Sequence, residues 1–284
     1  MSAALLASVA TRWSVDPLQL ALVCVVGIAY GVRARTLARR RRRPGAGRIV
    51  AFAAGLVVLV LALCSPIDAL GEERLFSVHM TQHLMIGDLA AVLLVAGVTG
   101  PMLRPLLAVG GLRRLRALLH PAVALGLWCT SLYLWHLPGP YEAALHHDAV
   151  HALEHACFLA AGVLLWATLL EPLPGPLWFT SGRKLGYLGA AQVAQIVLAT
   201  VFLWSGHVFY STYATAAPLA GISARTDQAL GGAVMLGEAT IVMAVAFTWT
   251  FFAFFREDEQ RQRLLEEGAG ERVAARAARY GRAP

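Results

Sequence analysis

IVAFAAGLVVLVLALCS, residues 49–65, is almost entirely aliphatic and contains no charged side chain. A helix rises about 1.5 Å per residue, so roughly 20 helical residues cross a hydrocarbon core of about 30 Å. Only helices and closed barrels satisfy their backbone polar groups in lipid, and an apolar run without alternation is typical of a helix. The segment therefore predicts a transmembrane helix.

Apolar segments of the same kind recur along the chain of 284 residues. Hydrophobic residues make up 58% of the chain, charged residues make up 14%, and the mean hydropathy is +0.61, which excludes an ordinary soluble domain. We therefore predict an all-α, polytopic membrane helix bundle with seven transmembrane helices. The expected spans lie near residues 16–33, 49–65, 74–98, 119–136, 149–170, 184–206 and 227–255. They form one transmembrane domain, residues 1–255, and a charged cytoplasmic tail follows, residues 256–284, which we expect to be a frayed helix.

Basic residues are concentrated on one side of the predicted spans. Eight arginines lie between Arg33 and Arg48, directly before the segment 49–65, whereas the sequence SPIDALGEE follows it. With the third loop, the fifth loop and the tail, this side carries 21 of the 24 lysines and arginines. By the positive-inside rule it is cytoplasmic, which predicts an outer N-terminus and a cytoplasmic C-terminus. The net charge of +7 then reflects orientation and contact with the lipid bilayer, and it does not indicate nucleic-acid binding.

Two of the predicted spans contain a pair of histidines. LFSVHMTQHLM, residues 75–85, places His79 and His83 four residues apart, and HHDAVHALEHACF, residues 146–158, does the same with His151 and His155. Residues i and i+4 lie on one face of a helix, so the two rings of each pair reach the same point. In the predicted orientation both pairs lie at overlapping depths just below the outer surface.

A shared ligand explains four histidines at one depth better than separate packing roles do. A single histidine in a membrane helix is more often a hydrogen-bonding residue between helices. Four such groups are costly in lipid, however, and neutral imidazole is the commonest metal ligand in proteins. The four histidines therefore predict a metal site. Copper is the metal we expect, because methionines accompany the histidines, while zinc or iron also suits imidazole.

Further polar and sulfur-containing side chains could complete or support this site. Asp227 opens the seventh span, where a helix N-cap is the competing role, and Glu238 returns to the same face. The residues that we expect as additional ligands or as partners of the ligands are Asp227, Glu154, Glu238, Met80 and Met235. The histidines at or beyond the outer boundary, which could form an access path, are His136, His146, His147 and His207.

Three longer motifs resemble those of a known family. SPIDALGEERLFSVHMTQHLMIGDLA, WHLPGPYEAALHHDAVHALEHACFLAAGVLLW and DQALGGAVML are similar, in order and spacing, to motifs of the CtaG family of multi-pass cytochrome c oxidase assembly factors. The resemblance extends from about Ser65 to Phe255. The family's histidine motifs fall on the four histidines above, and its seventh-span motif falls on Asp227, Gln228, Gly232 and Met235. The pair Gly87 and Asp88 departs from the family, in which many members have an apolar run with prolines.

The resemblance implies a multi-pass protein of the bacterial plasma membrane that is not an enzyme. Its expected partner is a haem-copper cytochrome c oxidase, whose copper centre it would help to mature as a copper-binding chaperone. Whether such a protein delivers copper or holds the oxidase subunits during assembly is left open by the resemblance.

Two other functions use similar residues. A haem-binding electron carrier also has intramembrane histidines, but its two axial ligands approach one iron from opposite sides, so a pair on one face would leave a histidine unused. A membrane metalloenzyme with a dimetal site would combine the histidines with Glu154, Glu238 and Asp227, although its usual spacing is Glu-x-x-His. A transporter is disfavoured, because no span has a broken-helix pattern.

Overall fold

The computed structural model of the chain describes residues 11–14, 17–109, 115–216, 219 and 221–281. The predicted outer N-terminus, the start of the first span at residue 16 and the end of the tail lie outside these residues. Apart from an isolated bridge between Leu219 and Ile222, the regular elements in the described residues are helices. The prediction of an all-α bundle is therefore confirmed.

Six helical segments among the described residues are long and apolar enough to cross a membrane. They are α2 (Pro17–Arg39), α3 (Ala46–Cys64), the continuous segment Phe76–Gly97, α11 (Asp148–Leu170), α12 (Ser181–Trp204) and α14 (Ala224–Glu266). The predicted span 119–136 corresponds to α9 (Pro121–Trp135), which is apolar but has only 15 residues. A short 3₁₀ helix, η2 (Leu115–Leu119), precedes α9. The structure thus supports six of the seven predicted spans by length, and the predicted fourth span is the shorter helix α9.

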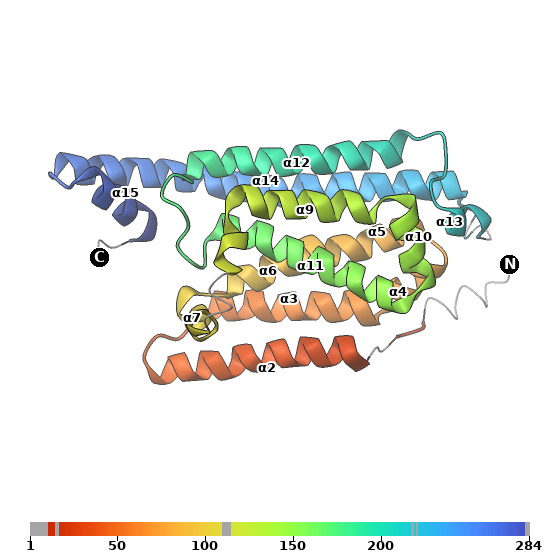
Figure 1. The fold of residues 1–284 in the computed structure, drawn as a ribbon, viewed down its shortest axis with the longest axis horizontal. Helices are drawn as coiled ribbons and strands as arrows, with labels where there is room; N and C mark the ends of the chain where they lie inside the picture. The colour runs from red at the N-terminus through yellow and green to blue at the C-terminus, as the bar shows by residue number, and fades with distance from the viewer. Residues whose placement is uncertain (1–10, 15–16, 110–114, 217–218, 220, 282–284) are drawn as a thin grey trace.

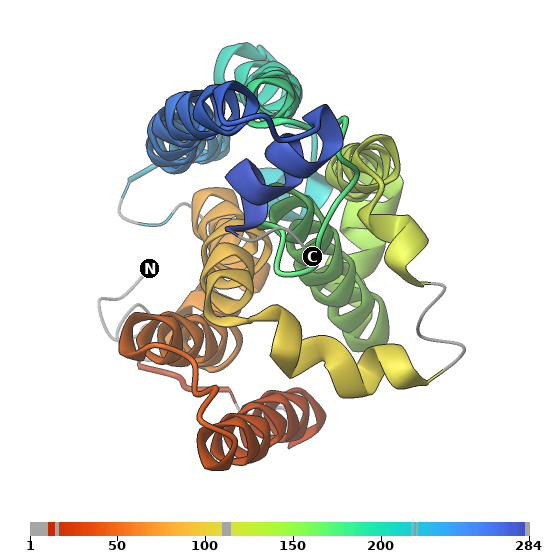
Figure 2. The same ribbon diagram turned by 90° about the vertical axis from the view of Figure 1, so that its left-hand side faces the viewer.

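The long helices form a bundle whose two ends carry different short helices (Figure 1). At one end lie α4 (Pro66–Glu73), α10 (Pro138–His146) and α13 (Ser211–Thr215). At the other end lie α7 (Gly100–Ala108) and α15 (Glu271–Tyr280). Figure 2, viewed along the bundle, shows α2 at the periphery, where it packs against α3 and α7. The most extensive helix pairing joins α12 to α14.

The segment Phe76–Gly97 changes its helical pitch in the middle. It consists of α5 (Phe76–Leu84), a π-helical turn η1 (Met85–Ala90) and α6 (Ala91–Gly97). The turn contains Gly87 and Asp88, the pair at which the sequence departs from the resembled family. π-Helical turns are rare overall but frequent at functional sites, and this one begins two residues after His83. It contacts α3 on one side and α11 on the other.

The charged tail is more ordered than the sequence predicts. Helix α14 continues past the expected boundary at residue 255 to Glu266, and α15 folds back against it. Arg279 of α15 forms an ion pair with Glu171 at the end of α11, and the Tyr280 hydroxyl accepts a hydrogen bond from the Gly175 backbone N–H. Buried Lys184 of α12 lies 3.1 Å from the same Glu171 carboxylate. This network ties the tail to the loop between α11 and α12, so the tail helix is docked and not frayed.

Candidate metal centre

The four predicted histidines meet inside the bundle. One ring nitrogen from each of His79, His83, His151 and His155 lies within 4.8 Å of every other, so these residues form one cluster, called here the four-histidine cluster. The first two are on α5 and the last two are on α11. Ring centroids are 5.4 Å apart for His79 and His151 and 5.6 Å apart for His83 and His155. Each pair thus keeps its i, i+4 alignment and faces the other pair.

All four rings are buried, with exposed fractions of 5% or less. The cluster lies toward the end of the bundle that carries α4, α10 and α13, because His79 is in the first turn of α5 and His151 is in the first turn of α11. Both helices begin at that end (Figure 1). Burial at this depth removes water as a hydrogen-bond partner, so the ring nitrogens depend on neighbouring side chains or on a bound ion.

A tyrosine sets the protonation of His79. The Tyr213 hydroxyl donates its hydrogen to the Gly71 carbonyl oxygen at 2.8 Å, so it can only accept from His79 Nδ1, which lies 3.0 Å away. Nδ1 of His79 therefore carries the proton and its lone pair is on Nε2. That Nε2 faces Nε2 of His83 at 2.8 Å. A fixed tautomer with the free nitrogen directed inward is the arrangement that outer partners give to metal-binding histidines.

The Glu72 carboxylate fixes the position of the proton on His151 in the same way. Glu72 of α4 forms a short contact with Nδ1 of His151, which leaves Nε2 as the lone-pair nitrogen. Glu72 and Asp68 also lie close enough to His151 to form a second group of candidate metal ligands at the outer edge of the cluster. Burial raises the pKa of the Asp68 carboxyl, and hydrogen bonds from Ser14 and Gln82 partly offset this rise.

Several ring nitrogens in the cluster have no hydrogen-bond partner among the described residues. They are Nδ1 of His83, Nε2 of His151 and both nitrogens of His155. Unpaired buried polar atoms are rare in proteins, because each costs about 1–3 kcal/mol. Here they belong to three of the four imidazoles whose candidate ligand nitrogens lie within 4.8 Å of one another. The donor set fits a metal ion that accepts nitrogen ligands, and copper, zinc and iron all belong to that class.

Glu154 lies beside the cluster and is not one of its four candidate ligands. Its carboxylate is fully buried, 3.7 Å from Nε2 of His83, and neither oxygen has a hydrogen-bond partner in the described part of the chain. A nearby cation stabilises a buried carboxylate. Glu154 is therefore a buried carboxyl group beside the imidazole of His83, and its role as a ligand or as a partner of the ligands stays a prediction.

The structure does not bring Asp227 or Glu238 into the cluster. Asp227 accepts hydrogen bonds from the Phe76 N–H at 2.6 Å and from the Ser77 N–H at 3.2 Å, so it caps the N-terminus of α5 from another helix. Glu238 interacts electrostatically with Asp88 of the π-helical turn. Both carboxylates therefore lie among groups other than the four histidines.

The predicted methionines and access-path histidines fall into a buried set and an exposed set. Met80, Met235 and His136 are buried, and Nε2 of His136 lies 3.3 Å from Sδ of Met80. Among the described residues, His146 and His147 at the end of α10 and His207 between α12 and α13 are exposed, and the access path stays a prediction. His136 does not belong to that exposed set, because it lies within the core beside His83, with ring centroids 6.2 Å apart.

Sequence reasoning missed two residues that shape the cluster, Glu72 and Tyr213. Both lie in segments that the sequence predicts as loops, and each is far in sequence from the histidine that it contacts. The sequence contains no signal that singles out these two residues, since carboxylates and tyrosines are common in loops. Helices α4 and α13 place them over the cluster.

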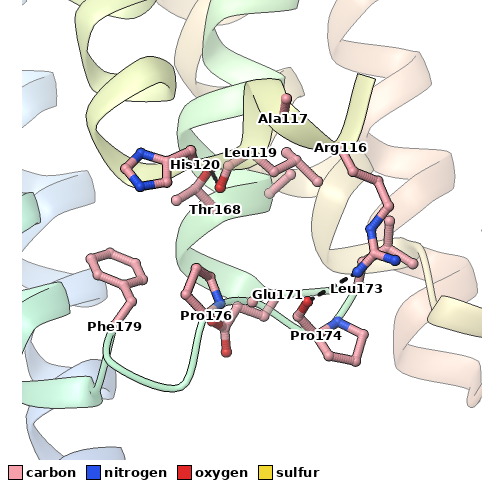
Figure 3. Close-up of a pocket in the computed structure, with 12 residues that line it drawn as sticks. Arg116, Ala117, Leu119, His120, Thr168, Glu171, Leu173, Pro174, Pro176 and Phe179 are labelled. Carbon is pink, nitrogen blue, oxygen red and sulfur yellow. Dashed lines mark hydrogen bonds between the residues drawn. The ribbon is translucent and has the colours of Figure 1, made fainter. Parts of the chain in front are cut away.

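A cavity lies at the end of the bundle opposite to the four-histidine cluster (Figure 3). Its volume is about 380 Å³, and His120, Glu171 and Phe179 are among the residues that line it. Figure 3 shows Arg116 donating to the Pro174 carbonyl and Thr168 donating to the Leu119 carbonyl, which link the walls of the cavity. The Glu171 carboxylate is already paired with Lys184 and Arg279, so the cavity offers no free anionic ligand from that residue.

Comparison with known proteins gives one family and several relatives. The sequence model described as cytochrome c oxidase caa3 assembly factor (Caa3_CtaG) matches residues 28–257. Uncharacterized proteins from Mycobacterium bovis and Mycobacterium tuberculosis are each 27% identical over 276 residues, covering 90% of this chain and 41% of the relative. A third, from Mycobacterium leprae, is 26% identical over 272 residues, covering 88% of this chain and 40% of the relative. The chain thus spans about two fifths of the length of the curated relatives it matches. No solved structure matches it significantly.

Proposed function

Because this chain belongs to the cytochrome c oxidase caa3 assembly factor (Caa3_CtaG) family, we propose that it helps to mature the copper centre of a haem-copper cytochrome c oxidase. The single observation that supports this function best is the convergence of four buried imidazoles from two helices. In this proposal His79, His83, His151 and His155 bind the copper ion that is passed to the oxidase. The partners are oxidase subunits, and the ion is cargo.

The unpaired nitrogens of the cluster suit a temporary site. Tyr213 and Glu72 orient two of the four ligands, whereas His155 has no described hydrogen-bond partner and the described hydrogen bond of His83 is to another ligand, His79. Rigidly held ligands favour retention of a metal, and less constrained ligands let it leave. A cluster with two oriented and two less constrained imidazoles can bind an ion and still release it to another protein.

The proposed topology has seven spans, with α9 as the short fourth span, an outer N-terminus and a cytoplasmic C-terminus. The distribution of lysine and arginine supports it, and it places the four-histidine cluster near the outer side of the bacterial plasma membrane. Copper would then be received from and delivered to that side. A reporter fused after Pro284 should be active only in the cytoplasm, and activity of that reporter outside the cytoplasm would refute the orientation.

Metal analysis of the purified full chain tests the binding site. Wild-type protein should retain copper, and single His→Ala changes at the four positions should weaken retention to a similar extent. His120→Ala is the matched control, because His120 is exposed at the opposite end of the bundle. Retention that is equal in wild type and in the four variants would refute copper binding by the cluster.

The assembly role is tested in cells. Cells that lack the protein should contain less active oxidase and less copper in the oxidase when copper is limiting. A complementing copy with His79→Ala and His155→Ala should fail to restore either quantity. Full oxidase activity without the protein would refute the assembly role, whatever the metal analysis gives.

A second candidate function is an intramembrane metalloenzyme with two metals. One observation favours it: Asp68 and Glu72 form a second ligand group that shares His151 with the four-histidine cluster. Carboxylate and imidazole ligands around neighbouring metals are typical of di-iron and di-manganese proteins. Bound iron at two ions per chain would support this alternative, and copper without iron would support the chaperone.

A further inference from the structure

A small cavity lies next to the four-histidine cluster in the core of the bundle. Its volume is about 30 Å³, and it is lined by residues that include His83, Met80, His136 and Met235. About 10–15 Å³ is enough for one water-sized particle, so the cavity has room for an ion. Because His83 lines the cavity and also belongs to the four-histidine cluster, the cavity is adjacent to the cluster.

The protonation of His136 follows from its backbone contact. Nδ1 of His136 lies 2.6 Å from the carbonyl oxygen of Leu132, and a carbonyl only accepts hydrogen bonds, so Nδ1 carries the proton. A neutral imidazole then has its lone pair on Nε2. A doubly protonated ring is disfavoured here, because the rings of Phe158 and Phe202 pack around His136 and a buried cation is costly.

The free nitrogen of His136 faces a second atom that cannot donate. Sδ of Met80 is 3.3 Å from Nε2 of His136, and a thioether carries only lone pairs. Two lone-pair donors pointing at each other in a buried site form no hydrogen bond. A cation bound beside both atoms satisfies both.

The separation of the two atoms suits a shared metal. A nitrogen about 2.0 Å and a sulfur about 2.3 Å from one ion lie near 3.3 Å from each other when the angle at the metal is about 100°. The buried thioether of Met235 lines the same cavity. Thioether and imidazole together favour Cu(I) over zinc or iron, whereas the all-imidazole cluster does not discriminate in this way.

We propose that Nε2 of His136 and Sδ of Met80, with Met235 on the cavity wall, form an inner Cu(I) site next to the four-histidine cluster. This inference rests on the proposed function for the identity of the cargo, but the binding itself is independent of any oxidase. The inner site would hold the reduced ion beside the four-histidine cluster, and His83 would border both sites.

The test uses full-length protein in detergent, loaded with Cu(I) under anaerobic conditions. Copper is counted by competition with a chromogenic Cu(I) chelator, and its ligands are identified by X-ray absorption at the copper edge. The variants are Met80→Leu and Met235→Leu, which conserve volume and remove sulfur. Met85→Leu is the control, because Met85 lies on the same helical segment but packs against the side of α3. Circular dichroism and gel filtration establish that each variant is folded.

We expect sulfur scattering from copper in the wild type and in Met85→Leu. Met80→Leu should lose that scattering together with one copper ion per chain, and a variant with His79→Ala and His155→Ala should keep it. Absence of sulfur scattering in the wild type, or its persistence in folded Met80→Leu, would overturn the inner site. Loss of copper from Met80→Leu with no loss from the His79 and His155 variant would refute copper binding by the four-histidine cluster and leave the inner site standing.

Discussion

Gly162 of α11 packs directly on the carbonyl of Gly87 in the π-helical turn: a Cβ built on Gly162 would lie 1.8 Å from the Gly87 oxygen. The two glycines let α11 and the segment Phe76–Gly97 approach until their backbones touch. Gly162 is seven residues after His155, two helical turns along the same face, and Gly87 is one turn after His83. The contact therefore sets the distance at which the two histidine pairs face each other.

Gly162→Ala should separate the histidine pairs and weaken metal retention. The added methyl cannot fit without moving a backbone, and overpacking of this kind costs about 1–3 kcal/mol. Thermal unfolding in detergent and copper retention measure the two effects. Gly189→Ala in α12 is the control, since a Cβ there meets no atom within 4 Å, and it should leave both properties unchanged or slightly improve stability. Equal behaviour of the two variants would show that the close contact does not position the cluster.

Glu72→Gln should lower copper affinity by about 10- to 100-fold, because it removes the carboxylate that holds the His151 tautomer. The loss should leave the stability of the fold nearly unchanged, since Glu72 is partly exposed. Chelator competition measures the affinity. Glu73→Gln is the matched control on the adjacent residue, whose carboxylate pairs with Arg12 and is 40% exposed. An affinity of Glu72→Gln indistinguishable from that of Glu73→Gln would contradict the role of Glu72.

Asp227→Asn distinguishes a helix cap from a metal ligand. Asp227 accepts hydrogen bonds from the backbone N–H groups of Phe76 and Ser77, so its replacement should cost about 1 kcal/mol of stability, the usual cost of a lost cap. Copper affinity should fall less than it does for any of the four His→Ala variants. Thermal unfolding and metal retention of the same preparations provide the comparison. A loss of copper as large as in His79→Ala, with unchanged stability, would identify Asp227 as a ligand.

The contact between α10 and α13 should weaken in acid. Burial tends to raise the pKa of Glu142, but hydrogen bonds from Thr212 and Ser211 outweigh it, and the pKa is lowered below the ordinary value of 4.5. A lowered folded-state pKa means that the ionised form stabilises the fold. This contribution is complete above the unfolded-state pKa and is lost as pH falls through the folded-state pKa.

Glu142→Gln should therefore reduce the dependence of unfolding temperature on pH below about 5, in the range where carboxylates titrate. Glu267→Gln, at an exposed position of the tail, is the control and should follow the wild type. A wild-type pH dependence in Glu142→Gln would mean that Glu142 does not stabilise this end of the bundle.

The sequence predicted the helices and the histidine faces well, because both depend on local spacing. The apolar runs gave α3, α11 and α12 within a few residues of their ends. It predicted less well where a helix departs from regular geometry. The π-helical turn at Gly87 has no local signature, since its extra residue is accommodated by packing against Gly162. Likewise α14 crosses the expected boundary at residue 255, because the charged residues beyond it still favour a helix.

By itself the sequence determined that the chain forms apolar helices and that His79 and His83, like His151 and His155, share a helix face. Spacing along one helix fixes such relations without reference to the rest of the molecule. Only the tertiary structure decided which groups meet the histidines. Glu72 orients His151 and Tyr213 orients His79, while Asp227 caps α5 and His136 turns toward Met80. These contacts join residues far apart in the chain, and they depend on the rotation and separation of packed helices, which the sequence of any one helix does not specify.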